Sequence, residues 1–144
     1  MGKIIDIQGS ILEGGGQILR MSMGFSALLK TPIHIYEIRG NRSKPGLKSQ
    51  HLNGLILVKQ ISNGRLSGDK MNSPEITFHP GTDRIIGGQT YSADTRTAGA
   101  TTLLAQVSLP CLLFGQKPCL LELKGGTNAD MAPQVDYYLS LIHI

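Results

Sequence analysis

The feature that most constrains this chain is an internal repeat, in which the same order of segments returns after about 85 residues. In the first copy Gly16 leads into an apolar helix, Pro32 ends it, and a strand follows. In the second copy Gly99 and Pro118 take the same places. A loop and the start of a second helix then follow in both copies. A repeat of this length predicts one supersecondary unit that is used at least twice.

Hydrophobic spacing predicts the elements of each unit. In the first unit we expect strands at residues 4–7, 33–38, 65–67 and 75–78, and helices at 17–29 and 45–62, the second opened by Pro45-Gly46. In the second unit we expect a helix after Gly99, kinked at Pro110, and a strand at 119–123. The predicted fold is α/β, with repeated βαβαββ units whose helices pack on one face of a mixed four-stranded sheet.

The second unit is expected to be incomplete. The predicted divisions are residues 1–80 for the first repeat, 81–137 for the incomplete second repeat, and 138–144 for an atypical apolar tail. We interpret this tail as a truncation boundary and assign no function to it.

Composition narrows the class of protein. Hydrophobic residues make up 40% of the 144 residues and charged residues 17%, which is an ordinary globular balance. Because no apolar run is long enough to span a membrane, a soluble intracellular protein is expected. Cys111 and Cys119 are predicted to be buried free thiols. The net charge of +4 is concentrated between residues 30 and 59, where it indicates either a solvated face or a ligand surface.

A glycine run, Gly14-Gly15-Gly16, lies between a predicted strand and a helix. Glycines let the backbone approach a ligand, and the free N–H groups of a helix start favour an anion. The run lacks the P-loop and dinucleotide patterns, so a simple tight turn is the alternative. Glu13 beside it suggests a hard divalent cation, Mg²⁺ or Mn²⁺, which would offset its repulsion of a phosphate.

Three arginines and a histidine follow at positions that predict convergence on this loop. Arg20 lies early in the first helix, while Arg39 and Arg42 follow the second strand, where α/β proteins place ligands. Their guanidinium groups suit the clamping of phosphate oxygens, although each alone fits a surface role. His51 lies on the apolar stripe of the second helix, so a core histidine is a strong alternative. The chain offers no convincing nucleophile.

Three motifs in order resemble the RNA 3′-terminal phosphate cyclases, most closely the eukaryotic catalytic branch. They are EGGGQILR at 13–20, IRGNRSKPGL at 38–47 with QHL at 50–52, and KGGTNADMAPQVDY at 124–137. The resemblance runs from about Ile4 to Tyr137. It implies a longer protein that uses ATP to convert an RNA 3′-phosphate into a 2′,3′-cyclic phosphate, through AMP-enzyme and RNA-adenylate intermediates.

The resemblance also implies roles for individual residues. Glu13 matches a metal-contacting carboxylate, and Gln106 and Pro133 match positions that line the ATP site. The residues that match groups holding the RNA phosphate are Arg20, Arg39, Arg42, Gln50 and His51. The expected cofactors are thus ATP and Mg²⁺ or Mn²⁺, and the expected partner is RNA ending in a 3′-phosphate. The required 2′-OH makes RNA the substrate for cyclisation.

One departure limits the expected activity. The family's nucleophilic histidine lies far toward the C-terminus, and none of His34, His51, His79 or His143 matches its context. The chain alone is therefore expected to be inactive in self-adenylylation. Two alternatives remain: a non-catalytic cyclase-like protein in ribosome biogenesis, and a truncated RNA-phosphate-binding fragment. The eukaryotic likeness favours the nucleus, with the cytoplasm as the alternative, and leaves the oligomeric state open.

Overall fold

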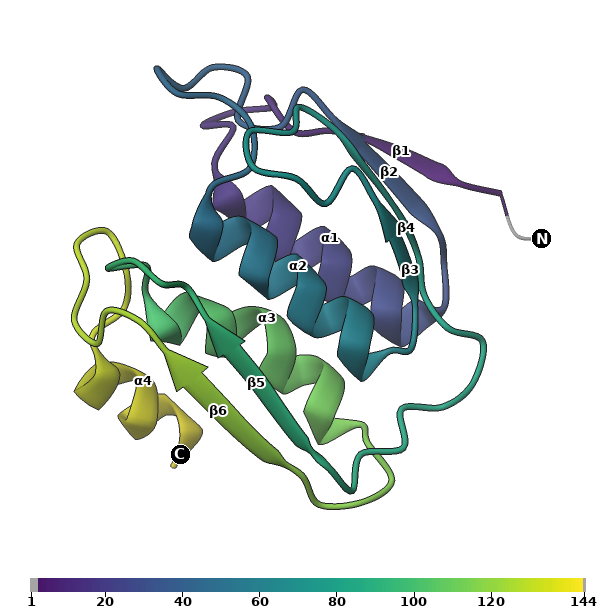
Figure 1. Cartoon of the computed structure of the whole chain (residues 1–144), viewed down its shortest axis with the longest axis vertical. Helices are drawn as coiled ribbons and strands as arrows, with labels where there is room; N and C mark the ends of the chain where they lie inside the picture. Colours follow the sequence, from purple (N-terminus) through teal and green to yellow (C-terminus); the bar gives the residue numbers. More distant parts are fainter. Residues whose placement is uncertain (1–2, 144) are drawn as a thin grey trace.

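A computed structural model describes residues 3–143 of the chain. The helices and strands follow one another in an order that repeats (Figure 1). In chain order they are β1 (Ile5–Gln8), α1 (Gly16–Leu29), β2 (Ile33–Tyr36), α2 (Ser49–Ile61), β3 (Arg65–Ser67), β4 (Ile76–His79), β5 (Thr90–Asp94), α3 (Thr101–Leu113), β6 (Leu120–Lys124) and α4 (Val135–Ile142).

The first unit is a mixed four-stranded sheet with two helices on one face. Its strand order is β1-β2-β4-β3, with β1 and β2 parallel and the remaining neighbours antiparallel. Parallel neighbours need a crossover connection, which α1 supplies. Figure 1 shows α1 and α2 side by side beneath this sheet. This arrangement confirms the predicted βαβαββ unit.

The second unit repeats the first half of this plan. β5 and β6 are parallel and are connected through α3, as β1 and β2 are through α1. Within residues 3–143 no strand follows α4, so the second unit has no counterparts of β3 and β4 and is incomplete, as predicted. α3 packs against both α1 and α2, which places the three helices between the two sheets (Figure 1).

Apolar stripes and one close approach hold the helices together. Leu19, Met23 and Ala27 recur at four-residue spacing on α1 and are buried. Gly54 of α2 faces α3, where a Cβ atom would lie 3.2 Å from Val107 Cγ1. The missing side chain allows the two helices to approach closely. The N-terminal ends of α1, α2 and α3 lie at the same end of the molecule (Figure 1).

Several predicted boundaries need correction. α2 begins at Ser49 and not at Pro45-Gly46, because Gly46 has a φ of +76°, outside the helical region. β2 ends at Tyr36 because Glu37 already has a positive φ of 51°. The strands predicted at 4–7, 75–78 and 119–123 lie one residue further along in each case, at 5–8, 76–79 and 120–124. The helix containing Pro110 continues to Leu113.

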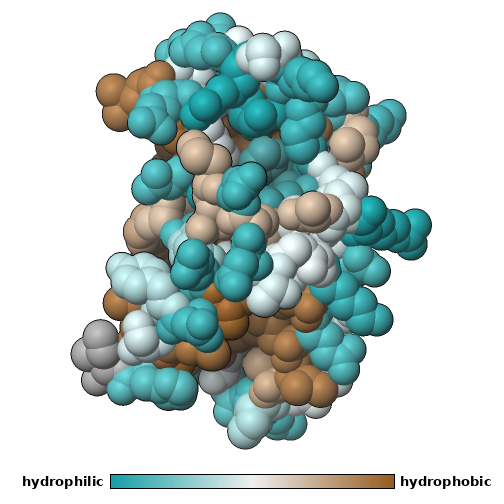
Figure 2. Space-filling model, turned by 90° about the vertical axis from the view of Figure 1, so that its left-hand side faces the viewer, coloured by the Kyte–Doolittle hydropathy of each residue, from teal (hydrophilic) through white to brown (hydrophobic). Residues whose placement is uncertain are grey.

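The sequence analysis missed β5, and it treated most of α4 as an atypical tail. β5 is short and polar, with only Tyr91 and Ala93 buried among its residues. α4 has no buried residue, and most of its large apolar side chains are exposed, namely Tyr137, Leu139, Leu141 and Ile142. In Figure 2 hydrophobic side chains gather over the lower part of the molecule, where α4 lies. The division of the chain at residue 80 stays a prediction.

Two further expectations concern cysteines and membranes. Cys111 is buried and Cys119 partly buried, and both are free thiols, as predicted. Burial raises the pKa of the Cys111 thiol to about 11, with Lys30 opposing the shift.

Across the described residues, no helix combines the length and the apolar character needed to cross a bilayer.

Candidate functional site

The N-terminus of α1 is open to an anion. Its N-cap residue, Gly15, makes no side-chain hydrogen bond to the helix, and the first turn contains no acidic residue. Gly14 turns the chain into the helix with a φ of 55°. The first N–H groups of the helix therefore have no capping side chain, and they carry the positive end of the helix dipole. A phosphate would satisfy both the donors and the dipole.

His51 reaches this helix end from the first turn of α2. A Cβ atom built on Gly16 would overlap with His51 Nε2 and lie 2.9 Å from Arg20 Nη1. Gly16 is therefore where the two side chains meet the helix end, and the absence of a side chain leaves room for both. His51 therefore points toward the start of α1, and its role in binding stays a prediction.

The protonation of His51 follows from its surroundings. Its pKa is lowered from 6.5 to about 4, first by burial and then by the positive charges of Arg39, Arg20 and Lys48. The ring is thus neutral near pH 7, with one N–H donor. His51 Nδ1 accepts from the backbone N–H of Lys48 at 3.3 Å. Nε2 must therefore carry the proton, so the donor of the ring points toward Gly16.

Arg20 contributes a charge that no carboxylate neutralises. Its Nε donates to Gln106 Oε1 at 2.7 Å. The ion pairs found in residues 3–143 do not include Arg20. Partial burial lowers the pKa of Arg20, although the group stays charged. A partly buried cation held by a neutral amide is prepared for an anionic ligand.

Arg42 and Glu13 lie on the outer rim of the same surface. Arg42 Nη2 would lie 3.3 Å from a Cβ on Gly15, and 4.0 Å separates it from Glu13 Oε2. The Glu13 side chain is 93% exposed, so this ion pair is weak. Arg42 therefore remains available to a ligand beside the glycine loop.

Arg39 is close to this cluster, but its Nη1 donates to two carbonyls of its own loop. Its Nη1 donates to Lys44 O at 2.8 Å and to Gly46 O at 3.1 Å. Partial burial, followed by the charge of Arg42, lowers the pKa of Arg39. The residue therefore shapes the loop before α2 and adds positive potential to the site.

Gln50 joins the two units. Its Oε1 accepts from the backbone N–H of Ala100 at 2.8 Å, at the N-terminus of α3. Ser49, its neighbour, donates through Oγ to Thr95 O. Gln50 Oε1 is thus engaged by the second unit, and its amide nitrogen is the donor left for a ligand.

Gln106 and Pro133, the residues expected at a nucleotide site, are both connected to α3. Thr102 Oγ1 donates to Pro133 O at 3.0 Å, and Thr102 lies one turn before Gln106 on that helix. α3 therefore links Pro133 to Arg20 through Thr102 and Gln106. Gln106 Oε1 is occupied by Arg20, so Nε2 is the donor left for a nucleotide.

The expected metal site rests on Glu13 alone. Within the described residues no group of three or more His, Cys, Asp or Glu side chains could hold a metal ion. Mg²⁺ is often held by a single carboxylate together with water and substrate phosphate, so one exposed Glu13 is compatible with such a site.

Two residues of the site were missed in the sequence analysis. Lys48 is the N-cap of α2, and its backbone N–H, which donates to His51 Nδ1, sets the tautomer of His51. Neither residue type belongs to the usual capping signature, so no signal in the sequence marks this contact. Ser49 was missed because nothing in its sequence context identifies Thr95 as its partner.

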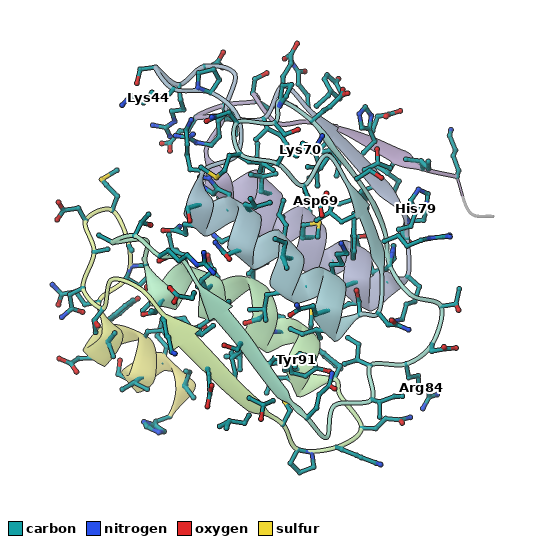
Figure 3. The ribbon with its side chains drawn as sticks, in the orientation of Figure 1. Lys44, Asp69, Lys70, His79, Arg84 and Tyr91 are labelled. Atoms are coloured by element: carbon teal, nitrogen blue, oxygen red, sulfur yellow. The ribbon has the colours of Figure 1, made fainter. Side chains whose placement is uncertain are left out.

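The site occupies one end of the molecule. Figure 3 shows Lys44 on the loop at this end and Arg84 at the opposite end. A separate cavity of about 450 Å³ lies at that opposite end, lined in part by Gln60, Arg84 and Tyr91. Another, of about 550 Å³, borders the glycine loop and is lined in part by Leu12, Glu13 and Gln17.

The structure is thus an α/β protein built from repeated units, with cationic side chains gathered around the start of α1. A family model described as RNA 3′-terminal phosphate cyclase matches residues 11–143. The chain belongs to the RNA 3′-terminal phosphate cyclase family. The match continues past Tyr137, where the sequence analysis ended the resemblance.

Curated relatives from several organisms support the same family assignment. An RNA 3′-terminal phosphate cyclase of Drosophila melanogaster is 44% identical over 135 residues, which cover 94% of this chain and 37% of the relative. A probable RNA 3′-terminal phosphate cyclase of Dictyostelium discoideum is 45% identical over 131 residues, covering 91% and 30%. One from Staphylothermus marinus is 45% identical over 135 residues, covering 94% and 37%. The chain thus spans about a third of the length of these relatives.

Proposed function

We propose that this chain supplies the RNA 3′-phosphate pocket of an ATP-dependent RNA 3′-terminal phosphate cyclase. The observation that carries the proposal is the meeting of Arg20, His51 and the uncapped start of α1 around Gly16. Three kinds of donor, a guanidinium, a neutral imidazole and backbone N–H groups, face one point. A terminal phosphate, which carries close to two negative charges, suits such a set.

The surface would act by binding and by orientation. Arg20 and Arg42 would neutralise phosphate oxygens from two sides, while the His51 Nε2–H would donate to a third oxygen. Bound in this way, the 3′-phosphorus is held near the neighbouring 2′-OH of the same ribose. Cyclisation then gains from intramolecular proximity.

ATP and a divalent cation belong to the same proposal. Glu13 would hold Mg²⁺ or Mn²⁺, which would shield phosphate charge when bound. Gln106 Nε2 and the segment around Pro133 would line the nucleotide site. Activation of the RNA phosphate by AMP would proceed through a histidine-bound AMP in the longer protein, since no histidine of this chain matches that nucleophile.

The central test compares RNA oligonucleotides that differ only at the 3′ end. Fluorescence anisotropy at one fixed salt concentration should show tighter binding of the 3′-phosphate than of the 3′-hydroxyl RNA, by at least about tenfold. The variant Arg42→Ala should reduce this preference. Arg65→Ala, which removes the same charge from β3 in the sheet, is the matched control and should retain it. Equal affinity of the wild-type chain for both RNAs would refute the pocket.

A second test addresses the covalent step. Incubation of the chain with radiolabelled ATP and Mg²⁺ should leave no AMP attached to the protein. Stable labelling would show that the nucleophile lies within these 144 residues and would overturn our placement of it.

A further inference from the structure

The hydrogen bond between Arg20 and Gln106 joins corresponding positions of the two repeats. Arg20 lies in the second turn of α1 and Gln106 in the second turn of α3, 86 residues later, close to the repeat length. The 2.7 Å distance from Arg20 Nε to Gln106 Oε1 indicates a well-formed bond. A side chain of the second unit thus holds an arginine of the first.

This bond determines which edge of the guanidinium faces the ligand. Arg20 Nε is directed to Gln106, while Nη1 lies beside Gly16 at the start of α1. Because the guanidinium is planar and rigid, fixing one edge fixes the direction of the others. An arginine without this partner would sample several rotamers and would lose entropy on binding.

The chemical type of the partner also matters. Glutamine accepts a hydrogen bond but carries no charge, so Arg20 keeps its full positive charge for a ligand. A glutamate in the same place could accept the bond as well, yet it would form an ion pair and compete with the phosphate. The neutral acceptor therefore orients Arg20 without neutralising its charge.

We propose that Gln106 is a positioning residue for the RNA 3′-phosphate, which it serves by holding Arg20 toward the start of α1. This inference rests on the proposed function. It means that phosphate recognition by the first unit depends on a side chain of the second. Gln106 would act on the phosphate only through Arg20.

The test uses the whole chain and the variants Gln106→Met and Gln106→Glu. Methionine removes the acceptor at similar size, and glutamate keeps the acceptor but adds charge. Gln106→Met should weaken binding of 3′-phosphate RNA by about five- to tenfold and leave 3′-hydroxyl RNA unaffected. Gln106→Glu should weaken 3′-phosphate binding at least as much.

Nuclear magnetic resonance of the arginine Nε–H groups gives a readout that is independent of RNA. The Arg20 Nε–H signal should be sharp and protected in the wild-type chain and in Gln106→Glu, but broadened in Gln106→Met. Urea unfolding checks that both variants fold. In an Arg20→Ala background, Gln106→Met should have no further effect on phosphate binding, because its action requires Arg20.

The results distinguish failure of the proposed phosphate pocket from failure of the positioning role of Gln106. If the wild-type chain does not distinguish the two RNA ends, the proposed function fails. If it does distinguish them and Gln106→Met binds as the wild type does, only the positioning role is overturned. An equal effect of Gln106→Met with and without Arg20 would likewise refute positioning, since Gln106 would then act by itself.

Discussion

Replacing Gly16 by alanine tests the geometry of the phosphate surface with a single methyl group. The added Cβ would overlap with His51 Nε2, and it would lie 2.7 Å from His51 Cδ2 and 2.9 Å from Arg20 Nη1. Comfortable contacts between such atoms begin at about 3.5 Å. Both side chains must therefore move outward by roughly 0.5–1 Å, and they do so at the point where they would meet the phosphate.

The folded state should tolerate this change. Alanine is favoured over glycine within a helix by about 1 kcal/mol, which offsets part of the cost of displacing two side-chain ends. The free energy of unfolding, measured in urea, should thus change by no more than about 1 kcal/mol. Binding is different, because a charge-assisted hydrogen bond contributes about 1.5–3 kcal/mol. Losing one lowers the affinity for 3′-phosphate RNA by about tenfold or more.

The same helix provides the control. A Cβ on Gly24 would have Val107 O, at 3.9 Å, as its nearest neighbour, so it makes an ordinary contact. Gly24→Ala should stabilise the chain by up to about 1 kcal/mol and leave the RNA affinity unchanged. Anisotropy titrations with both RNA ends measure the outcome. If Gly16→Ala keeps the wild-type affinity for 3′-phosphate RNA, then His51 and Arg20 do not bind the phosphate as we infer.

Three further outcomes follow from the same contacts. Because the pKa of His51 is lowered from 6.5 to about 4, this side chain binds a proton in the unfolded chain but not in the folded chain between these pH values. Stability measured by urea unfolding should rise from about pH 4 to about pH 6.5, by at most about 3 kcal/mol, and His51→Gln should lose this rise. Arg39→Ala should expose its loop to limited proteolysis and cost about 1–3 kcal/mol, since two loop carbonyls lose their donor. Gln50→Ala should cost about 1 kcal/mol in urea by removing the acceptor of the Ala100 N–H.

The meeting of Arg20 and His51 at the start of α1 could be predicted from the sequence, because helix geometry determines which side chains lie on the same face. A glycine run before an apolar helix places free N–H groups at a helix start, and Arg20 follows one turn later on the same helix. The apolar stripe of α2 places His51 toward α1, since both helices bury their stripes against the same core. Periodicity therefore determined which side chains face one another.

The rest depended on backbone contacts that residue type does not encode. The charge of Arg39 suggested a ligand, yet its Nη1 donates to two carbonyl oxygens of its own loop. The side-chain carbonyl of Gln50 accepts from the backbone N–H of Ala100, fifty positions away. β5 was missed because its alternation, Tyr91 and Ala93 among polar residues, is too weak to distinguish it from a loop. Only the assembled units show these partners.

The partners of the cationic groups share one property that accounts for the behaviour of the site. Arg20 is held by an amide oxygen and Arg39 by backbone carbonyls, so neither bond removes positive charge. The neutral His51 ring accepts from a backbone N–H and likewise adds no negative charge. Arg42 alone faces a carboxylate, at 4.0 Å and in solvent. Burial lowers the pKa values of Arg20, Arg39 and His51, and neighbouring cations lower those of Arg39 and His51 further, which expresses the cost of holding these groups at this site. An anion that binds among them relieves that cost, and by linkage it stabilises the folded chain. The cost of desolvating these groups, with the repulsion between Arg39 and Arg42, is therefore part of the affinity for phosphate, and neutral partners preserve it.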